Sequence, residues 1–217
     1  MAKRMIEKHK KATRIFHWLH LITFITMLWT GLSLFYPPMN VMSLPFGSLR
    51  NAAFVHKYLG FFYLLLPLLY AIFNFKLFSG FMKLISTFTP EDKKWMKVFG
   101  GYLSPIIKAK EIPPQGKINA GQKLLGWIII IFSLCLGLTG SMMFFYASFP
   151  GYLIQVAIIV HVFCGTFLGS AIIVHFYLGA INPSSRKELG TMLGNGMIDE
   201  EYVMKHNALW YEELKKQ

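Results

Sequence analysis

The chain has 217 residues, of which 54% are hydrophobic and 15% charged, and its formal net charge is +12. A soluble domain usually carries about a quarter charged residues, so this composition excludes an ordinary soluble protein. The basic residues gather in a few polar segments next to apolar runs, which argues against a nucleic-acid-binding protein.

The apolar residues form four runs, at positions 15–36, 54–75, 122–146 and 152–180. Each run is long enough to cross a bilayer as a helix, and none alternates polar and apolar residues as a barrel strand does. The first run is too long for a signal-peptide core and no cleavage site follows it, so we expect it to be retained. The sequence therefore predicts an all-α membrane protein, a single domain over residues 1–217 built as a bundle of four transmembrane helices.

The segments that connect these runs differ in charge. Basic residues crowd the N-terminal arm and the segment between the second and third runs: Lys3, Arg4, Lys8, Lys10, Lys11 and Arg14, then Lys76, Lys83, Lys93, Lys94, Lys97, Lys108, Lys110 and Lys117. By contrast, Arg50 is almost alone in the first connection, and residues 147–151 carry no charge. Because Lys and Arg mark the cytoplasmic side and attract anionic lipid, both termini, the loop 76–121 and the tail 181–217 are expected to be cytoplasmic. Within that loop, Thr89 and the residues after it predict the start of a short helix.

Two histidines in the last apolar run, His161 and His175, have no charged residue between them. At ~100° per residue their spacing returns both imidazoles to nearly one helix face, about 40° apart, and at ~1.5 Å per residue it separates them by about 21 Å. One helix would thus hold two imidazoles near opposite sides of a ~30 Å hydrocarbon layer. His17 and His56 lie at the starts of the first and second runs.

The predicted topology decides which of these histidines can meet. Successive helices cross in opposite directions, so His17 shares the cytoplasmic side with His175. By the same reasoning, His56 shares the outer side with His161. Each pair can ligate one heme iron from both faces, which leaves no open position and restricts the iron to electron transfer. Since the chain has no C-x-x-C-H site and its two cysteines lie in apolar runs, two hemes b are expected.

Other roles are open for these residues. A histidine inside the membrane can hydrogen-bond a neighbouring helix or relay protons, as in a heme-free anchor or transporter. His20, one turn deeper than His17, competes with it as a heme ligand. Arg14 and Lys57 can meet heme propionates or simply extend to the membrane edge. Glycines of the third and fourth runs can admit a porphyrin or serve ordinary helix packing: Gly137, Gly140, Gly165 and Gly169.

Several stretches of the sequence match one family. They are residues 14–18 around His17, residues 55–60 around His56, the two histidines His161 and His175, and residues 116–123 with their Asn-Ala-Gly-Gln run. On these residues the chain resembles the cytochrome b, or gamma, subunit of membrane-bound formate dehydrogenases, over nearly its whole length including Trp210 and Tyr211. The resemblance implies four helices, the same two pairs of heme ligands, and His17 in preference to His20.

The resemblance also implies a menaquinone site at the cytoplasmic heme. Its residues would be Asn119, Gly121, Gln122 and His175. Electrons would arrive from an iron–sulfur subunit and a molybdenum or tungsten catalytic subunit on the periplasmic side of a bacterial inner membrane, in an oligomer of the whole complex. The chain has no cysteine clusters for iron–sulfur centres, so we expect it to be the quinone-reactive subunit, inactive alone. From the residues alone, Asn119 can equally be the cap of the third helix.

Similar diheme subunits serve several oxidoreductases of anaerobic respiration. The alternatives within this architecture are the cytochrome b subunit of an uptake hydrogenase and that of a thiosulfate-type reductase. In the reductase, electrons would run from quinol to the partner. The residues of this chain do not distinguish these partners from a formate dehydrogenase.

Overall fold

The structure, a computed structural model, describes residues 4–103, 111–183 and 186–216. In chain order the elements are β1 (Met5–Glu7), α1 (Lys11–Phe35), η1 (Pro37–Phe46), α2 (Leu49–Phe73), α3 (Phe75–Ser86), α4 (Pro90–Val98), η2 (Phe99–Gly101), α5 (Ala120–Phe144), η3 (Tyr146–Ser148), α6 (Gly151–Phe176), η4 (Tyr177–Ile181), α7 (Arg186–Leu193), β2 (Met197–Asp199), α8 (Glu200–His206) and α9 (Ala208–Lys215). In the described ranges, four helices are long and apolar enough to cross a membrane: α1, α2, α5 and α6 with η4. This confirms the predicted all-helical membrane architecture. The predicted cytoplasmic residues Lys3, Lys108 and Lys110 lie outside the described ranges.

Local signals explain where the long helices begin and end. Pro37 and Pro38 follow the end of α1, where proline cannot continue the helix. The hydroxyl of Ser48 accepts a hydrogen bond from the backbone nitrogen of Asn51 at 3.1 Å and caps α2. α1 begins at Lys11 and α2 at Leu49, so both helices start earlier than the predicted positions 15 and 54. Apolar runs locate the part of a helix that suits a membrane, whereas the cap locates the helix itself.

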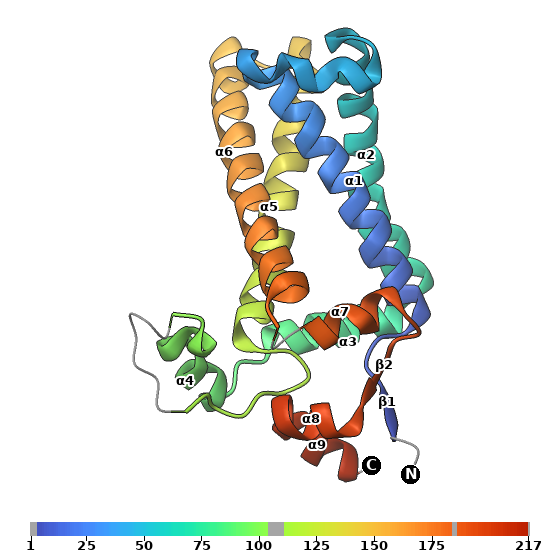
Figure 1. The fold of residues 1–217 in the computed structure, drawn as a ribbon. Coiled ribbons are helices and arrows are strands. Elements are labelled where there is room, and N and C mark those ends of the chain that lie inside the picture. The colour runs from blue at the N-terminus through green and yellow to red at the C-terminus, as the bar shows by residue number, and fades with distance from the viewer. Residues whose placement is uncertain (1–3, 104–110, 184–185, 217) are drawn as a thin grey trace. The chain divides into compact units, whose positions relative to one another are not determined.

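The chain divides into two compact units, each described by itself below. Unit 1 comprises Met1–Arg14, Lys76–Ile128 and Phe176–Gln217, and unit 2 comprises Ile15–Phe75 and Ile129–His175. In unit 2 the long helices run alongside one another (Figure 1). The hydroxyls of Tyr63 on α2 and Ser133 on α5 are hydrogen-bonded at 2.7 Å, and a Cβ added to Gly169 of α6 would lie 3.1 Å from Leu28 of α1. Unit 2 is thus the helical bundle of the protein.

Unit 1 contains a small antiparallel sheet that the sequence did not predict. β1 pairs with β2, with Met5 opposite Asp199 and Ile6 opposite Ile198. Beside this pair, a cluster of hydrophobic side chains joins the N-terminal arm to the C-terminal tail: Ile6, Ile198, Tyr202, Val203, Trp210, Tyr211 and Leu214. Strands of three residues are too short to show an alternating pattern, so these two could not be predicted from the sequence.

Within unit 1, α4 begins where Thr89 predicted a helix start. Thr89 and Asp92 form a capping box, in which the Thr89 hydroxyl accepts from the Asp92 nitrogen and the Asp92 carboxylate accepts from the Thr89 nitrogen. The same carboxylate is bound by Lys123 of α5, whose Nζ lies 2.6 Å from Asp92 Oδ2 and 2.8 Å from the carbonyl oxygen of Thr87. A buried ion pair therefore ties the start of α4 to the start of α5.

Candidate functional site

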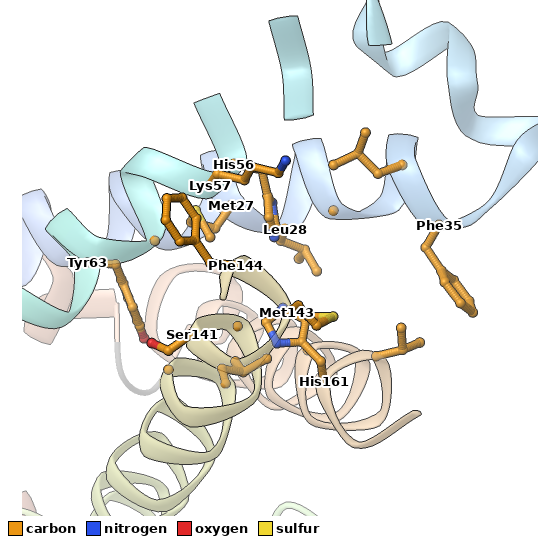
Figure 2. A pocket seen from close by; sticks show the side chains of 18 of the residues that line it. Met27, Leu28, Phe35, His56, Lys57, Tyr63, Ser141, Met143, Phe144 and His161 are labelled. Carbon is orange, nitrogen blue, oxygen red and sulfur yellow. The ribbon is translucent and has the colours of Figure 1, made fainter. Parts of the chain in front are cut away.

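His56 on α2 and His161 on α6 face each other inside unit 2. Their ring centroids are 6.1 Å apart and their planes are inclined by 67°. Both side chains extend into one cavity, as Figure 2 shows. The structure therefore brings together the two residues that the sequence paired on the predicted outer side.

A threonine hydroxyl lies behind each of these imidazoles. Thr30 Oγ1 is 2.9 Å from Nδ1 of His56, and Thr139 Oγ1 is 2.9 Å from Nδ1 of His161. A hydroxyl has one proton to donate. Thr30 donates its proton to the backbone carbonyl of Thr26 at 2.8 Å, and Thr139 donates to that of Cys135 at 2.7 Å.

A carbonyl oxygen and an imidazole nitrogen are both within hydrogen-bond distance of each hydroxyl. When the proton of the neutral ring is on Nδ1, the hydroxyl oxygen accepts it and the hydroxyl donates its own proton to the carbonyl. The lone pair is then on Nε2, which is free to bind a metal. In this tautomer His56 and His161 would both offer Nε2 to a heme iron.

The glycine that follows each threonine makes room for the ring. A Cβ added to Gly31 would lie 3.1 Å from Cε1 of His56, and one added to Gly140 would lie 3.3 Å from Cε1 of His161. Both distances are shorter than ordinary van der Waals contacts. A Thr-Gly dipeptide on α1 thus positions the histidine of α2, and a second one on α5 positions the histidine of α6.

The geometry of this site fits a heme. Metal–imidazole bonds are roughly 2 Å long and the nitrogen lies about 1 Å from the ring centre, so two imidazoles on one metal have centroids about 6 Å apart. The observed 6.1 Å agrees with this value. The cavity has a volume of about 390 Å³, and among the described residues Lys57 is the one charged side chain that lines it. An apolar, glycine-rich space with two opposed imidazoles suits a flat, largely apolar macrocycle.

His17 and His175, the second predicted pair, also belong to unit 2. They interact electrostatically with each other, and the buried Nδ1 of His17 has no hydrogen-bond partner among the described residues. The competing residue His20 stacks on Tyr63, with ring centroids 4.2 Å apart, and on Phe16 at 5.3 Å. Nδ1 of His20 is likewise buried without a hydrogen-bond partner among the described residues, so the preference for His17 over His20 stays a prediction.

The predicted quinone residues lie at the start of α5 in unit 1. Asn119 and Gln122 form a reciprocal pair, in which Asn119 Oδ1 accepts from the Gln122 nitrogen and Gln122 Oε1 accepts from the Asn119 nitrogen, both at 2.9 Å. Asn119 therefore caps the helix, as one reading of the sequence expected. Both side-chain oxygens are used in this cap, so the two amide NH₂ groups are the donors that a ligand carbonyl could engage.

Gly121, the third residue predicted at the quinone site, has a packing role. A Cβ added there would lie 2.8 Å from the ring of Trp95, and one added to Gly100 would lie 2.3 Å from the same ring. Trp95 is buried between the two glycines. Packing alone therefore explains a glycine at position 121.

For the other residues singled out in the sequence, some lie where a role at the heme site is possible and others have a structural role. Lys57 lines the cavity beside His56, whereas the Arg14 guanidinium donates to the carbonyl of Gly194 within unit 1. Gly140 clears the His161 ring, but Gly169 serves packing against Leu28. The sequence reasoning missed Thr30 and Thr139, although their repeated Thr-Gly dipeptides inside apolar runs were a visible signal.

The chain is similar to known cytochrome b proteins. Residues 8–195 match the family model for prokaryotic cytochrome b561. The cytochrome b556(Fdn) subunit of the nitrate-inducible formate dehydrogenase of Escherichia coli K12 is 26% identical over an alignment of 220 positions, which covers 98% of this chain and 93% of that subunit. The formate dehydrogenase cytochrome b556 subunit of Haemophilus influenzae is 27% identical over an alignment of 221 positions, which covers 96% of this chain and 83% of that subunit. Because the family model covers most of its length, this chain belongs to the prokaryotic cytochrome b561 family.

Proposed function

We propose that this chain is the diheme cytochrome b subunit of a membrane-bound formate dehydrogenase. The observation that carries the proposal is the opposed pair His56 and His161, 6.1 Å apart with the Nδ1 of each ring bound to a threonine. The cytochrome b family implies heme b, and the relatives named above are subunits of formate dehydrogenases.

In this proposal His56 and His161 hold one heme b, and His17 and His175 hold the other. Heme bound at these histidines would supply one-electron redox chemistry. The histidines would hold the hemes, and the other lining residues keep the cavity of His56 and His161 largely apolar. This arrangement limits the sites to electron transfer, because neither oxygen nor substrate reaches an open position.

Menaquinone is the proposed electron acceptor. Asn119 and Gln122 can donate their amide hydrogens to a quinone carbonyl while their oxygens continue to cap α5. A quinone that gains two electrons also gains two protons, so its site should lie near water on the cytoplasmic side. The inclusion of Gly121 and His175 in this site rests on the family resemblance.

The electron donors in this proposal are partner subunits. An iron–sulfur subunit and a molybdenum or tungsten catalytic subunit would dock on the periplasmic side, in a bacterial inner membrane. Electrons would then pass from the heme held by His56 and His161 to the heme held by His17 and His175, and on to quinone. Taking up protons in the cytoplasm while formate is oxidised outside would build a proton-motive force.

A spectrum of the native complex tests the proposal. The complex is purified from membranes through a tag on this chain, its heme is quantified per chain, and co-purifying subunits are identified. Two hemes b per chain together with a formate-oxidising subunit support the proposal. One heme or none refutes the diheme reading. Two hemes with a hydrogenase or a sulfur-compound reductase instead would refute the formate partner and leave the electron path intact.

A further inference from the structure

The hydrogen bonds of Thr30 and Thr139 are unusual for threonines in apolar helices. Most such hydroxyls bond to a carbonyl one turn earlier and to nothing else, as Thr23 of α1 does with Leu19 at 2.7 Å. Thr30 and Thr139 make this same bond, and in addition the hydroxyl of each lies 2.9 Å from Nδ1 of a histidine on the neighbouring helix, where it can accept the Nδ1 proton. Both are buried, with 0% and 6% of their surfaces exposed.

The same arrangement occurs twice on different helices. Thr30 on α1 supports His56 on α2, and Thr139 on α5 supports His161 on α6. In each case hydrogen bonds connect a backbone carbonyl, a threonine hydroxyl and an imidazole. Packing of the helices does not require this, since a valine would fill the same volume. The same set of hydrogen bonds at two sites points to a function at the histidines themselves.

We propose that Thr30 and Thr139 are positioning residues that lower the reduction potential of the heme held by His56 and His161; this inference rests on the proposed diheme function. A hydrogen bond accepted from Nδ1–H makes the imidazole a stronger electron donor through Nε2. A stronger donor stabilises the ferric iron more than the ferrous iron. Two such ligands, one on each face, act in the same direction.

The second histidine pair lacks this support at one of its ligands. Nδ1 of His17 is buried and has no hydrogen-bond partner among the described residues. A heme held by His17 and His175 would therefore have a weaker donor on at least one face, and a higher potential. Electrons would run downhill from the site of His56 and His161 to the site of His17 and His175. The difference in ligand hydrogen bonding thus sets the direction of transfer.

A redox titration of the native complex in membranes tests this inference. The variants are Thr30→Val and Thr139→Val, which remove the hydroxyl and keep the shape. Thr30→Ser and Thr139→Ser keep the hydroxyl, and Thr23→Val is the matched control because its hydroxyl contacts only the backbone. The heme that survives in a His161→Ala variant identifies which of the two potentials belongs to His17 and His175.

The expected result is a rise in the lower of the two potentials in each valine variant, with the other potential unchanged. Each tenfold loss of preference for ferric over ferrous iron raises the potential of this one-electron couple by ~59 mV. The serine variants and Thr23→Val should titrate like the wild type. Loss of one heme in a valine variant, with two hemes retained in the matching serine variant, also supports the positioning role.

Two outcomes would overturn the inference. One is a valine variant with two hemes and unchanged potentials, which would reduce the threonines to packing residues. The other is a wild-type complex in which the heme of His56 and His161 has the higher potential. Both differ from failure of the proposed function, which would show as fewer than two hemes per chain in the wild type before any titration.

Discussion

The buried polar contacts of the two units differ in charge. In unit 2 they join neutral groups, such as Tyr63 with Ser133 and Thr30 with His56. In unit 1 they include ion pairs, such as Lys123 with Asp92, beside neutral contacts, such as Asn207 with the carbonyl of Gly116. A lone charge in an apolar helical bundle is costly, whereas hydrogen-bonded neutral groups are tolerated there. The neutral contacts of unit 2 are therefore available to orient cofactor ligands, while the ion pairs of unit 1 hold short segments together.

The N-terminal arm, which belongs to unit 1, is also held by a buried ion pair. Lys8 is 2% exposed, forms an ion pair with Glu188 of α7, and lies 3.4 Å from Oδ1 of Asn207. A buried ammonium needs such partners, because taking it out of water without them costs several kcal/mol. Changes in unit 1 should therefore act on stability, and changes around the cavity of unit 2 should act on heme.

The largest expected effect is the loss of a whole cofactor. His161→Ala removes one of two opposed imidazoles and should leave the complex with one heme per chain in place of two, as measured by heme quantitation. His20→Ala is the control, because its ring stacks on Tyr63 and should not ligate. Two hemes retained in His161→Ala, or one lost in His20→Ala, would contradict the assignment of ligands.

Breaking the buried ion pair of unit 1 should destabilise the fold without removing heme. Asp92→Ala leaves Lys123 buried and unpaired, which costs roughly 3–5 kcal/mol. Glu91→Ala is the control, because it breaks an exposed pair with Lys94 and should cost at most about 1 kcal/mol. Limited proteolysis of the loop 76–121 and thermal unfolding measure the difference. Equal behaviour of the two variants would mean that the buried pair adds nothing.

The pH dependence of that stability follows from the pKa of Asp92. Burial alone would raise this pKa, but the hydrogen bonds from Lys123 and Thr89 and the charge of Lys123 outweigh it and hold the pKa below the ordinary value of 3.8. Since the folded pKa is the lower one, the stabilisation is fully present above pH 3.8 and is lost as the pH falls through the folded pKa. The stability gap between wild type and Asp92→Asn should therefore be constant at neutral and mildly acidic pH and close only in strong acid.

A smaller effect is expected from crowding a ligand ring. Gly140→Ala places a methyl group 3.3 Å from Cε1 of His161 and should tilt the ring away from its partner. We expect heme affinity to fall by about tenfold, as when a contact that orients a metal ligand is disturbed. Gly151→Ala, also on a long helix, has open space around it and should bind heme normally. Heme retention during detergent washing compares the two.

The sequence predicted what depends on apolar length and on the spacing of rare residues. Four helices and the meeting of His56 with His161 came from those two signals. The sheet of β1 and β2 could not be predicted, because contacts between the two ends of the chain fix strands of only three residues. The role of Thr30 was hidden for a similar reason. In the sequence, a threonine in an apolar run looks like a packing residue. Only the structure shows that the histidine of the next helix lies 2.9 Å from its hydroxyl.

Substitutions of Asn119 should have the smallest effect on stability, and they separate its role as a helix cap from its proposed role in quinone binding. Asparagine and serine are about equally good helix caps, so Asn119→Ser keeps the cap of α5 but removes the amide NH₂ group. Asn119→Ala removes both and should cost about 1 kcal/mol of stability. If the amide binds quinone, both variants should reduce menaquinone slowly with normal heme content and normal formate-dependent heme reduction. If Asn119 is only a cap, Asn119→Ser should match the wild type in quinone kinetics. In that case the neutral contacts of unit 2 would serve the cofactors, and those at the start of α5 would serve the fold alone.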